Sequence, residues 1–200
     1  VEVLSDTVNA FQLEMTEAGR VADVFFTASK LSTLTVPQLV DSMREAAPAA
    51  SAMGLSLEET ATVLAGFASK GVKGAKAGTA FRLLLPRLAK PPVKTARALR
   101  FLGVSVFDAT GQMRPMIDIL KDMQEGMKGL TGAQKAAVLK ALAGEEAFSK
   151  LGGLMDSNLD TLGSWQEEMK KGGALQHAFS QKMGAASEPV RLLWISVQDL

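Results

Sequence analysis

Hydrophobic residues recur every three or four positions through most of the 200-residue chain. Leu84, Leu85 and Leu88 are one example, because this spacing places all three side chains on one side of a helix. The pattern predicts amphipathic helices that bury their apolar sides against each other. They are expected over residues 1–15, 16–30, 36–54 with a kink at Pro48, 57–70, 75–89, 92–103, 115–128, 132–143, 145–151, 159–171 and from 174 onward.

Polar residues mark where several of these helices begin. Ser56 is followed three positions later by Glu59, and Thr131 by Gln134, which is the spacing of a capping box. Thr35 precedes a Val-Pro pair and predicts a third helix start, because proline is favoured in the first turn of a helix. The helices are therefore expected to be short and individually capped.

The segment from Val104 to Arg114 has a different pattern. Val-Ser-Val-Phe is rich in β-branched and aromatic residues, and Asp108 to Gly111 has the composition of a turn. We therefore predict an all-α fold, a compact bundle of short helices with one small β-hairpin or extended loop near residues 104–114.

Helix breakers argue against a long rod. The longest stretch without Pro or Gly runs from Val1 to Ala18, and as a helix of about 1.5 Å per residue it would span only about 27 Å. Pro86 interrupts another predicted helix and should kink it, because proline lacks the amide that would bond the preceding turn. A long coiled coil is excluded, and the piece should be compact.

Charge is distributed unevenly along the chain. The window from Thr60 to Phe107 contains no Asp or Glu but holds nine cations. Because nine of the 22 basic residues lie there, the rest of the chain has 13 cations against 21 acids, a net charge of −8. A nearly neutral protein thus consists of a strongly basic segment within an acidic remainder, which points to an anionic partner.

The first part of this basic window is the candidate binding site. Its residues lie on a predicted loop and the helix that follows: Lys70, Lys73, Lys76, Arg82, Arg87 and Lys90. The alternative is ordinary surface charge, paired with acids from the rest of the chain after folding. Phe81 and Phe101 are expected in the core, so no stacking platform for bases is predicted, and nucleic-acid binding is not expected as the main role.

The sequence favours no catalytic chemistry. There is no Cys and only one His, His177, and no nucleophile or metal-ligand motif surrounds it. Gly66 and Gly71 have the spacing of a phosphate-binding loop, but Val72 and Lys73 stand where that motif requires Lys and Ser or Thr. We predict no enzyme activity, no cofactor and no metal site.

Four phrases follow one another between Ser56 and Leu120: SLEET, KGVKGAKAGTA, RLLLPRLAKPP and ALRFLGVSVFDATGQMRPMIDIL. In this order they resemble the shared core region of tail tape measure proteins from long-tailed phages and prophages, and the resemblance runs from Arg20 to Leu154. It implies a helical structural protein that lies inside the tail tube, sets tail length during assembly and leaves when DNA is ejected. In that family the helix is usually unbroken where this chain has Pro86.

The resemblance also implies partners and a location. The partners would be the tail tube protein and tail assembly chaperones, with self-association in addition, and DNA or membrane contact would not be the main role. The protein would reside in the virion tail and, during assembly, in the host cytoplasm. The chain is expected to be a fragment of a longer one, with N-terminal helices in 1–53, the core region in 54–156, and helices leading onward in 157–200.

Two other functions stay open from the sequence. A membrane-active helical module that aids genome delivery is favoured by the apolar run from Val190 to Val197, which includes Trp194. The second alternative is that the chain is part of a cell-wall hydrolase, because proteins of the family it resembles can carry such an activity elsewhere in the chain.

Overall fold

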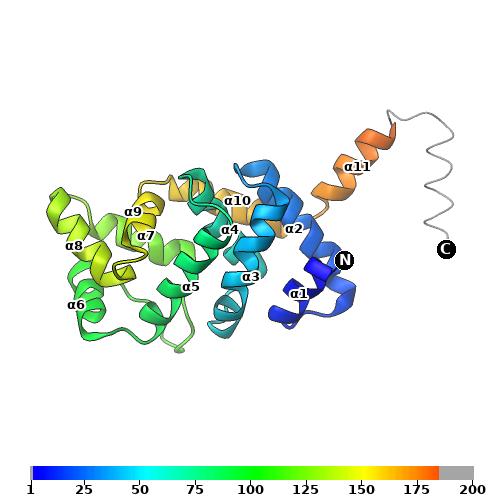
Figure 1. The fold of residues 1–200 in the computed structure, drawn as a ribbon. Helices are drawn as coiled ribbons and strands as arrows, with labels where there is room; N and C mark the ends of the chain where they lie inside the picture. The colour runs from blue at the N-terminus through cyan, green and yellow to red at the C-terminus, as the bar shows by residue number, and fades with distance from the viewer. Residues whose placement is uncertain (1, 185–200) are drawn as a thin grey trace.

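The computed structural model describes residues 2–184, so the apolar run around Trp194 lies outside the described residues. Within that range the chain is helical and contains no strand, which confirms the predicted all-α fold (Figure 1). Helices α6 and α8 lie at one end of an elongated body, α1 lies at the other, and α11 projects away from the body. The elements are α1 (Glu2–Ala10), the short 3-10 helix η1 (Met15–Glu17), α2 (Ala18–Leu31), α3 (Val36–Ala52), α4 (Leu57–Ser69), α5 (Ala75–Ala89), α6 (Val93–Leu102), α7 (Met116–Gly126), α8 (Gly132–Ala143), α9 (Phe148–Met155), α10 (Leu159–Lys171) and α11 (Ala174–Gly184).

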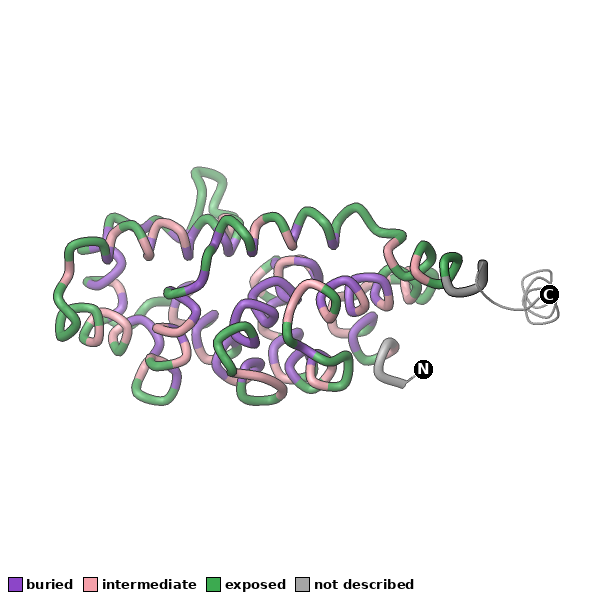
Figure 2. Tube along the Cα trace, turned by 90° about the horizontal axis from the view of Figure 1, so that it is seen from above, coloured by how far each residue is buried: buried purple, intermediate pink, exposed green. Residues whose placement is uncertain are grey.

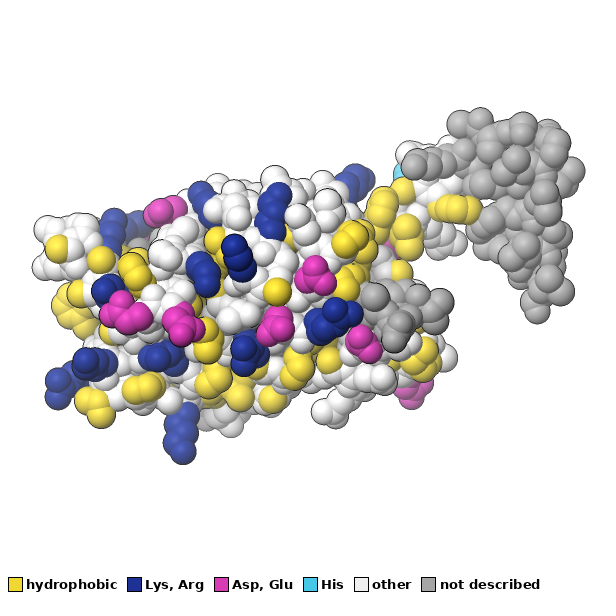
Figure 3. Space-filling model, in the orientation of Figure 1, with side chains coloured by type: hydrophobic (Ala, Val, Ile, Leu, Met, Phe, Trp, Pro, Cys, Tyr) yellow, Lys and Arg dark blue, Asp and Glu magenta, His cyan; other side chains and the backbone are white. Residues whose placement is uncertain are grey.

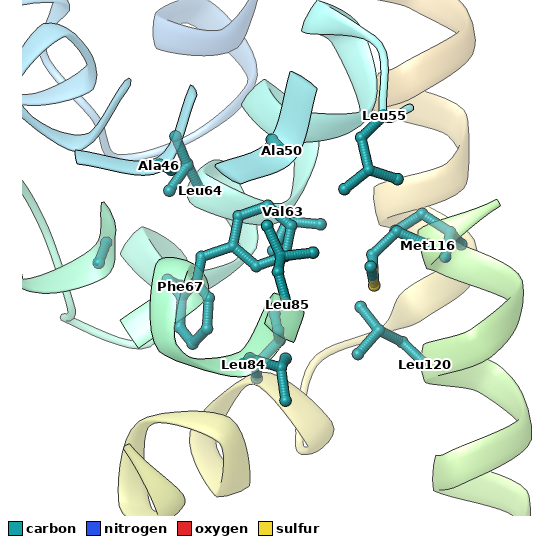
Figure 4. Close-up of a cluster of buried hydrophobic side chains, with 14 of the residues drawn as sticks. Ala46, Ala50, Leu55, Val63, Leu64, Phe67, Leu84, Leu85, Met116 and Leu120 are labelled. Atoms are coloured by element: carbon teal, nitrogen blue, oxygen red, sulfur yellow. The ribbon is translucent and has the colours of Figure 1, made fainter. Parts of the chain in front are cut away.

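Helix α4 forms the centre of the body. Every residue from Thr60 to Ala68 is buried, because α2, α3, α5, α7, α9 and α10 all pack against this helix. A methyl group added at Gly66 would lie 2.7 Å from the side chains of Leu154 and Leu162, so the small residue allows α9 and α10 to come close. Leu64 and Phe67 of α4 meet apolar side chains from α3, α5 and α7 in the core (Figure 4).

The predicted capping boxes are confirmed. The Ser56 hydroxyl accepts a hydrogen bond from the Glu59 amide, and the Glu59 carboxylate accepts one from the Ser56 amide. Thr35 and Thr131 begin α3 and α8 in the same way. At the other end of α4, Gly71 adopts a φ of +82° and the Val72 amide donates to the Phe67 carbonyl, which closes the helix and turns the chain toward α5.

Helices α3 and α5 make the closest helix pair. A methyl group at Gly78 would lie 2.2 Å from the Ser42 carbonyl oxygen, so only glycine lets the two backbones approach this closely. Both helices contain an internal proline, and neither ends there: α3 continues past Pro48 to Ala52, and α5 continues past Pro86 to Ala89. Each proline is exposed, and buried residues precede and follow it, Ala47 and Ala50 in α3 and Leu85 and Leu88 in α5, so packing holds each helix on through its proline.

The β-hairpin anticipated near residues 104–114 was wrong. The described chain has a single antiparallel bridge there, between Phe107 and Met113, and no ladder. The Asp108 carboxylate accepts hydrogen bonds from the amides of Thr110 and Gln112. The backbone closes the turn as well, because the Gly111 amide donates to the Asp108 carbonyl and the Asp108 amide donates to the Gln112 carbonyl. Because two short strands are only marginally stable without further neighbours, the segment remains an extended loop.

The first predicted helix is also shorter than expected. It ends at Ala10, and Gln12 has a φ of +54° while the Leu13 amide closes the turn on the Val8 carbonyl. Met15, the last residue of the predicted helix, lies beyond its observed end and is 59% exposed. Hydrophobic spacing does not report this early end, because the helix stops where Gln12 adopts the left-handed region that Gln rarely occupies.

Burial falls sharply at the other end of the described chain. Figure 2 shows buried positions concentrated within the body, whereas residues 174–181 of α11 are all exposed or half-buried. Gly172 and Gly173 both have positive φ values, +68° and +80°, and lead the chain out of α10 into α11. The buried Asp23 carboxylate accepts a 2.7 Å hydrogen bond from the Leu175 amide and so fixes the start of α11 against α2.

Candidate partner-binding surface

The nine cations of the acid-free window lie on consecutive elements. Lys70 and Lys73 are in the α4–α5 connection, Lys76, Arg82 and Arg87 are on α5, Lys90 follows α5, and Lys94, Arg97 and Arg100 are on α6. Figure 3 shows Lys and Arg side chains over α5 and α6 on this face, with Asp and Glu side chains between them in the middle of the body. The face is therefore mixed in charge around α5.

Two of the six predicted site residues bind the chain's own backbone. The Lys70 ammonium donates a 2.9 Å hydrogen bond to the Asp156 carbonyl, and the Lys73 ammonium donates a 2.7 Å bond to the Thr33 carbonyl. Each bond ties the α4–α5 connection to a neighbouring loop. Because an ammonium satisfies only one of its three donors in this way, both lysines still present charge at the surface.

Two more predicted residues contact neighbouring helices or loops. Arg82 forms an ion pair with Glu45 of α3 at 3.5 Å, and both side chains are more than a third exposed. An exposed pair of this kind contributes about 0–1 kcal/mol. Arg87 is half-buried against the α8–α9 connection, where a methyl group at Gly144 would lie 2.9 Å from its guanidinium. Both arginines therefore take part in packing.

Lys76 and Lys90 are the remaining two. Both are exposed, and neither has an ion pair or a hydrogen bond from its ammonium to any described residue. They lie at opposite ends of α5. Of the six residues singled out from the sequence, these two have the most charge available for an outside partner.

One exposed feature was missed from the sequence. Phe81 is buried as expected, but the expectation that Phe101 lies in the core was wrong, because its side chain is 65% exposed. The buried residues of α6 are Thr95, Ala98, Leu99 and Leu102. The helical period places Phe101 on the opposite side, together with Arg97, so the spacing within α6 could have revealed its exposure.

The other charged contacts are structural. Glu58 is buried at the start of α4 and accepts a 2.8 Å hydrogen bond from the Arg20 Nε of α2. This hydrogen bond is the main cause that raises the pKa of Arg20 above its ordinary value, and it joins α2 to the start of α4. Among residues 2–184 no three His, Asp or Glu side chains gather in a way that could hold a metal ion.

No helix in the described part of the chain has both the length and the apolar character to cross a membrane. His177 lies exposed on α11. In the described part of the chain, the exposed cations of α5 and α6 are the candidate partner-binding surface.

Comparison with known proteins gives consistent matches. A family model described as phage-related minor tail protein matches residues 1–144. The chain is 36% identical over 161 residues to the tape measure protein of Pneumococcus phage Dp-1, covering 80% of this chain and 14% of that protein. It is 36% identical over 149 residues to the probable tape measure protein of Escherichia phage P2, covering 74% of this chain and 18% of that protein.

The chain thus spans less than a fifth of the length of either relative. No solved structure matches it significantly. The aligned relatives come from phages of two different hosts, and the matched family model covers α1 to α8, including the whole basic window.

Proposed function

The chain belongs to the family of phage-related minor tail proteins, and from that membership we propose that it is one segment of a tape measure protein. Such a protein would occupy the lumen of the tail tube and set tail length during assembly. The observation that carries the proposal is the 36% identity to tape measure proteins of two phages over most of this chain. The location would be the virion tail, after assembly in the host cytoplasm.

The fold supports a particular part in that function. The longest described helix, α3, has 17 residues, and at about 1.5 Å per residue it spans only about 26 Å. This segment would therefore be a folded helical domain of the parent protein. The extended segments that set tail length would lie elsewhere in the parent chain.

Genetics in the parent phage or prophage tests the role. We expect an in-frame deletion of codons 2–184 to leave heads normal and tails absent or altered in length, as seen by electron microscopy. Tails of normal length and number would contradict the proposal.

Duplicating this segment in the parent gene tests whether it is a folded domain or one extended helix inside the tail. As one helix the 200 residues would add about 300 Å at about 1.5 Å per residue. A second copy of the segment should lengthen the tail by far less, because the folded body is compact. Elongation close to the full helical length would show that the segment is extended inside the tube.

We also propose that the basic surface around α5 contacts an anionic tail component, with the tail tube protein first and tail assembly chaperones or a second copy as further partners. The residues are those predicted from the sequence: Lys70, Lys73, Lys76, Arg82, Arg87 and Lys90. Lys76 and Lys90 are the sharpest probes, because their ammonium groups have no hydrogen bond or ion pair to described residues that a substitution would remove.

The test is co-sedimentation of the purified chain with tubes of the tail tube protein from the same phage. The double variant Lys76→Glu, Lys90→Glu should bind several-fold more weakly than the unmodified chain. The matched control Lys30→Glu, Lys135→Glu changes net charge equally on α2 and α8. If both double variants weaken binding to the tail tube equally, the effect is due to net charge and the proposal for the α5 surface is wrong.

Neither catalysis nor a cofactor forms part of the proposal. We expect a cell-wall hydrolysis assay of the purified chain to be blank, and clear activity would overturn this point. The division into N-terminal helices in 1–53, a core region in 54–156 and C-terminal helices in 157–200 is likewise a proposal. Limited proteolysis that released fragments at these boundaries would support it.

A further inference from the structure

Helix α6 presents an outward face that combines positive charge with exposed apolar groups. Its five residues, here called the α6 face, are Val93, Lys94, Arg97, Arg100 and Phe101. All five are exposed, with Phe101 at 65% and Val93 at 68%. Because residues follow one another by about 100° around a helix, the five side chains leave α6 within an arc of about 120°.

The opposite side of α6 is firmly held. Thr95 is fully buried, and its hydroxyl donates a 2.6 Å hydrogen bond to the Ala141 carbonyl of α8. At the other end, a methyl group at Gly126 of α7 would lie 2.5 Å from the Leu102 carbonyl, so the two helices meet without a gap. The α6 face is therefore rigid, and a ligand would pay little ordering cost on binding it.

The cations of this face are not committed to the fold. Lys94 and Arg97 form no ion pair and no side-chain hydrogen bond with any described residue, and the Arg100 Nε donates only to the Ala96 carbonyl of its own helix, at 3.4 Å. The nearest acid along the chain, Asp108, uses its carboxylate to close its own turn. Three positive charges thus face solvent around an exposed aromatic ring.

The order of these groups indicates the class of ligand. At about 100° per residue, Arg97 lies between Val93 and Phe101 on the helix surface, while Lys94 and Arg100 flank them on either side. The two apolar groups therefore stand singly among charges. The centre of a protein–protein interface is depleted in charge and apolar over a continuous area. Cations that alternate with single aromatic platforms are typical of single-stranded nucleic-acid sites, where bases stack on rings and phosphates meet Lys and Arg.

We propose that the α6 face binds single-stranded nucleic acid without sequence preference. A base stacks on the Phe101 ring, and Lys94, Arg97 and Arg100 contact successive phosphates. These cations advance by about 4.5 Å per step along the helix, which keeps each within reach of a neighbouring phosphate. The proposal does not depend on the tail function, since it rests on the geometry of α6 alone.

Fluorescence anisotropy with the 200-residue chain and a labelled 20-nucleotide oligo(dT) tests it. We expect tighter binding to this strand than to a 20-base-pair duplex, because only unpaired bases can stack on Phe101. Affinity should fall with salt at a slope near −2 on a log–log scale, as about three phosphate contacts would give at about −0.7 each.

Three variants separate stacking from charge. Phe101→Ala should weaken oligo(dT) binding about tenfold and leave the salt slope unchanged, because it removes only stacking. Arg97→Gln should weaken binding and reduce the slope by about 0.7, because it removes one phosphate contact. Lys30→Gln removes one exposed charge from α2, outside both proposed surfaces, and should change neither. Circular dichroism melting of each variant checks that it is folded.

The overturning results are equally definite. If Phe101→Ala leaves binding unchanged, or if Lys30→Gln weakens it as much as Arg97→Gln does, the binding reflects net charge alone and the proposal is overturned. Equal or tighter binding of poly-L-glutamate, or of vesicles containing anionic phosphatidylglycerol, would assign the α6 face to an acidic polypeptide or a lipid surface instead. None of these outcomes touches the tail-tube test, which uses Lys76 and Lys90.

Discussion

Helices α5 and α6 follow each other in the acid-free window, and each carries three cations, yet the fold uses them differently. On α5, Arg82 pairs with Glu45 of α3 and Arg87 packs against the α8–α9 connection. On α6, all three cations face solvent without a carboxylate partner in the described chain. The difference follows from position, because α5 packs against α3, α4, α8 and α9, while α6 lies at the end of the body against α7 and α8.

This contrast shows that clustered charge in a sequence is not yet a binding surface. A cation becomes part of the fold when a neighbouring element offers a carbonyl or carboxylate within reach, and only the remaining cations are available to a partner. Two of the three α5 cations are therefore used within the fold, whereas all three α6 cations are available to a partner.

The largest expected effect comes from the close contact that makes α5 structural. Gly78→Ala would place a methyl group 2.2 Å from the Ser42 carbonyl, so α3 and α5 must separate. We expect a loss of about 3 kcal/mol in the free energy of unfolding, at the upper end for overpacking of a tight contact. Urea denaturation followed by circular dichroism measures it.

Gly19→Ala is the matched control for that change. It lies in α2 with no atom near the added methyl group, so the substitution should stabilise the chain by up to about 1 kcal/mol through helix propensity alone. Similar stability changes for the two glycine variants would mean that α3 and α5 are not in close contact at Gly78. The view that α5 is held by this contact would then be wrong.

A smaller effect is expected where α6 is attached. Thr95→Val keeps the side-chain shape but removes the buried hydroxyl that donates to the Ala141 carbonyl. It should cost about 1–2 kcal/mol, because the carbonyl is left without this donor. Thr79 is a half-buried residue of α5 whose hydroxyl forms no hydrogen bond with a described residue. Thr79→Val should therefore lower the free energy of unfolding by less than about 0.5 kcal/mol. Equal costs would show that α6 is not anchored by this bond.

The sequence predicted helix starts and core faces well, because both depend on neighbours within a turn or two. The capping boxes at Ser56 and Thr131 and the buried side of α5 are local patterns of this kind. The end of α1 at Ala10 depends on a backbone closure that hydrophobic spacing does not report. Nor does that spacing report how far residues 104–114 pair, and they stop at one bridge between Phe107 and Met113.

The candidate surface was only partly accessible from the sequence. The acid-free window shows which elements carry the cations, but the carbonyls that accept from Lys70 and Lys73 come from loops 86 and 40 residues away along the chain. No local rule identifies such partners. The exposure of Phe101 was different, because its position relative to Leu99 and Leu102 within α6 contained the information.

Replacing single cations by methionine tests directly which of them contribute to the free energy of unfolding. Lys73→Met removes the hydrogen bond to the Thr33 carbonyl at the entrance to α5, and we expect it to cost about 1 kcal/mol. Arg97→Met on α6 removes no hydrogen bond or ion pair within the described chain and should stay within about 0.5 kcal/mol of the unmodified chain. Urea denaturation of both variants in parallel gives the difference, and a larger loss for Arg97→Met would reverse the roles assigned to the two regions.

The smallest effect concerns Asp108, the first acid after the basic window. Its pKa lies below the ordinary 3.8, first because the Thr110 hydroxyl donates to its carboxylate and then because the Gln112 amide does. Since folding lowers this pKa, the turn gains stability above the ordinary value and loses it as the pH falls through the lower, folded value. A carboxyl NMR titration should show that Thr110→Ala raises the pKa of Asp108 toward 3.8, whereas Arg100→Gln leaves it unchanged. A rise caused by Arg100→Gln would mean that Asp108 neutralises the α6 face, and the contrast between α5 and α6 would disappear.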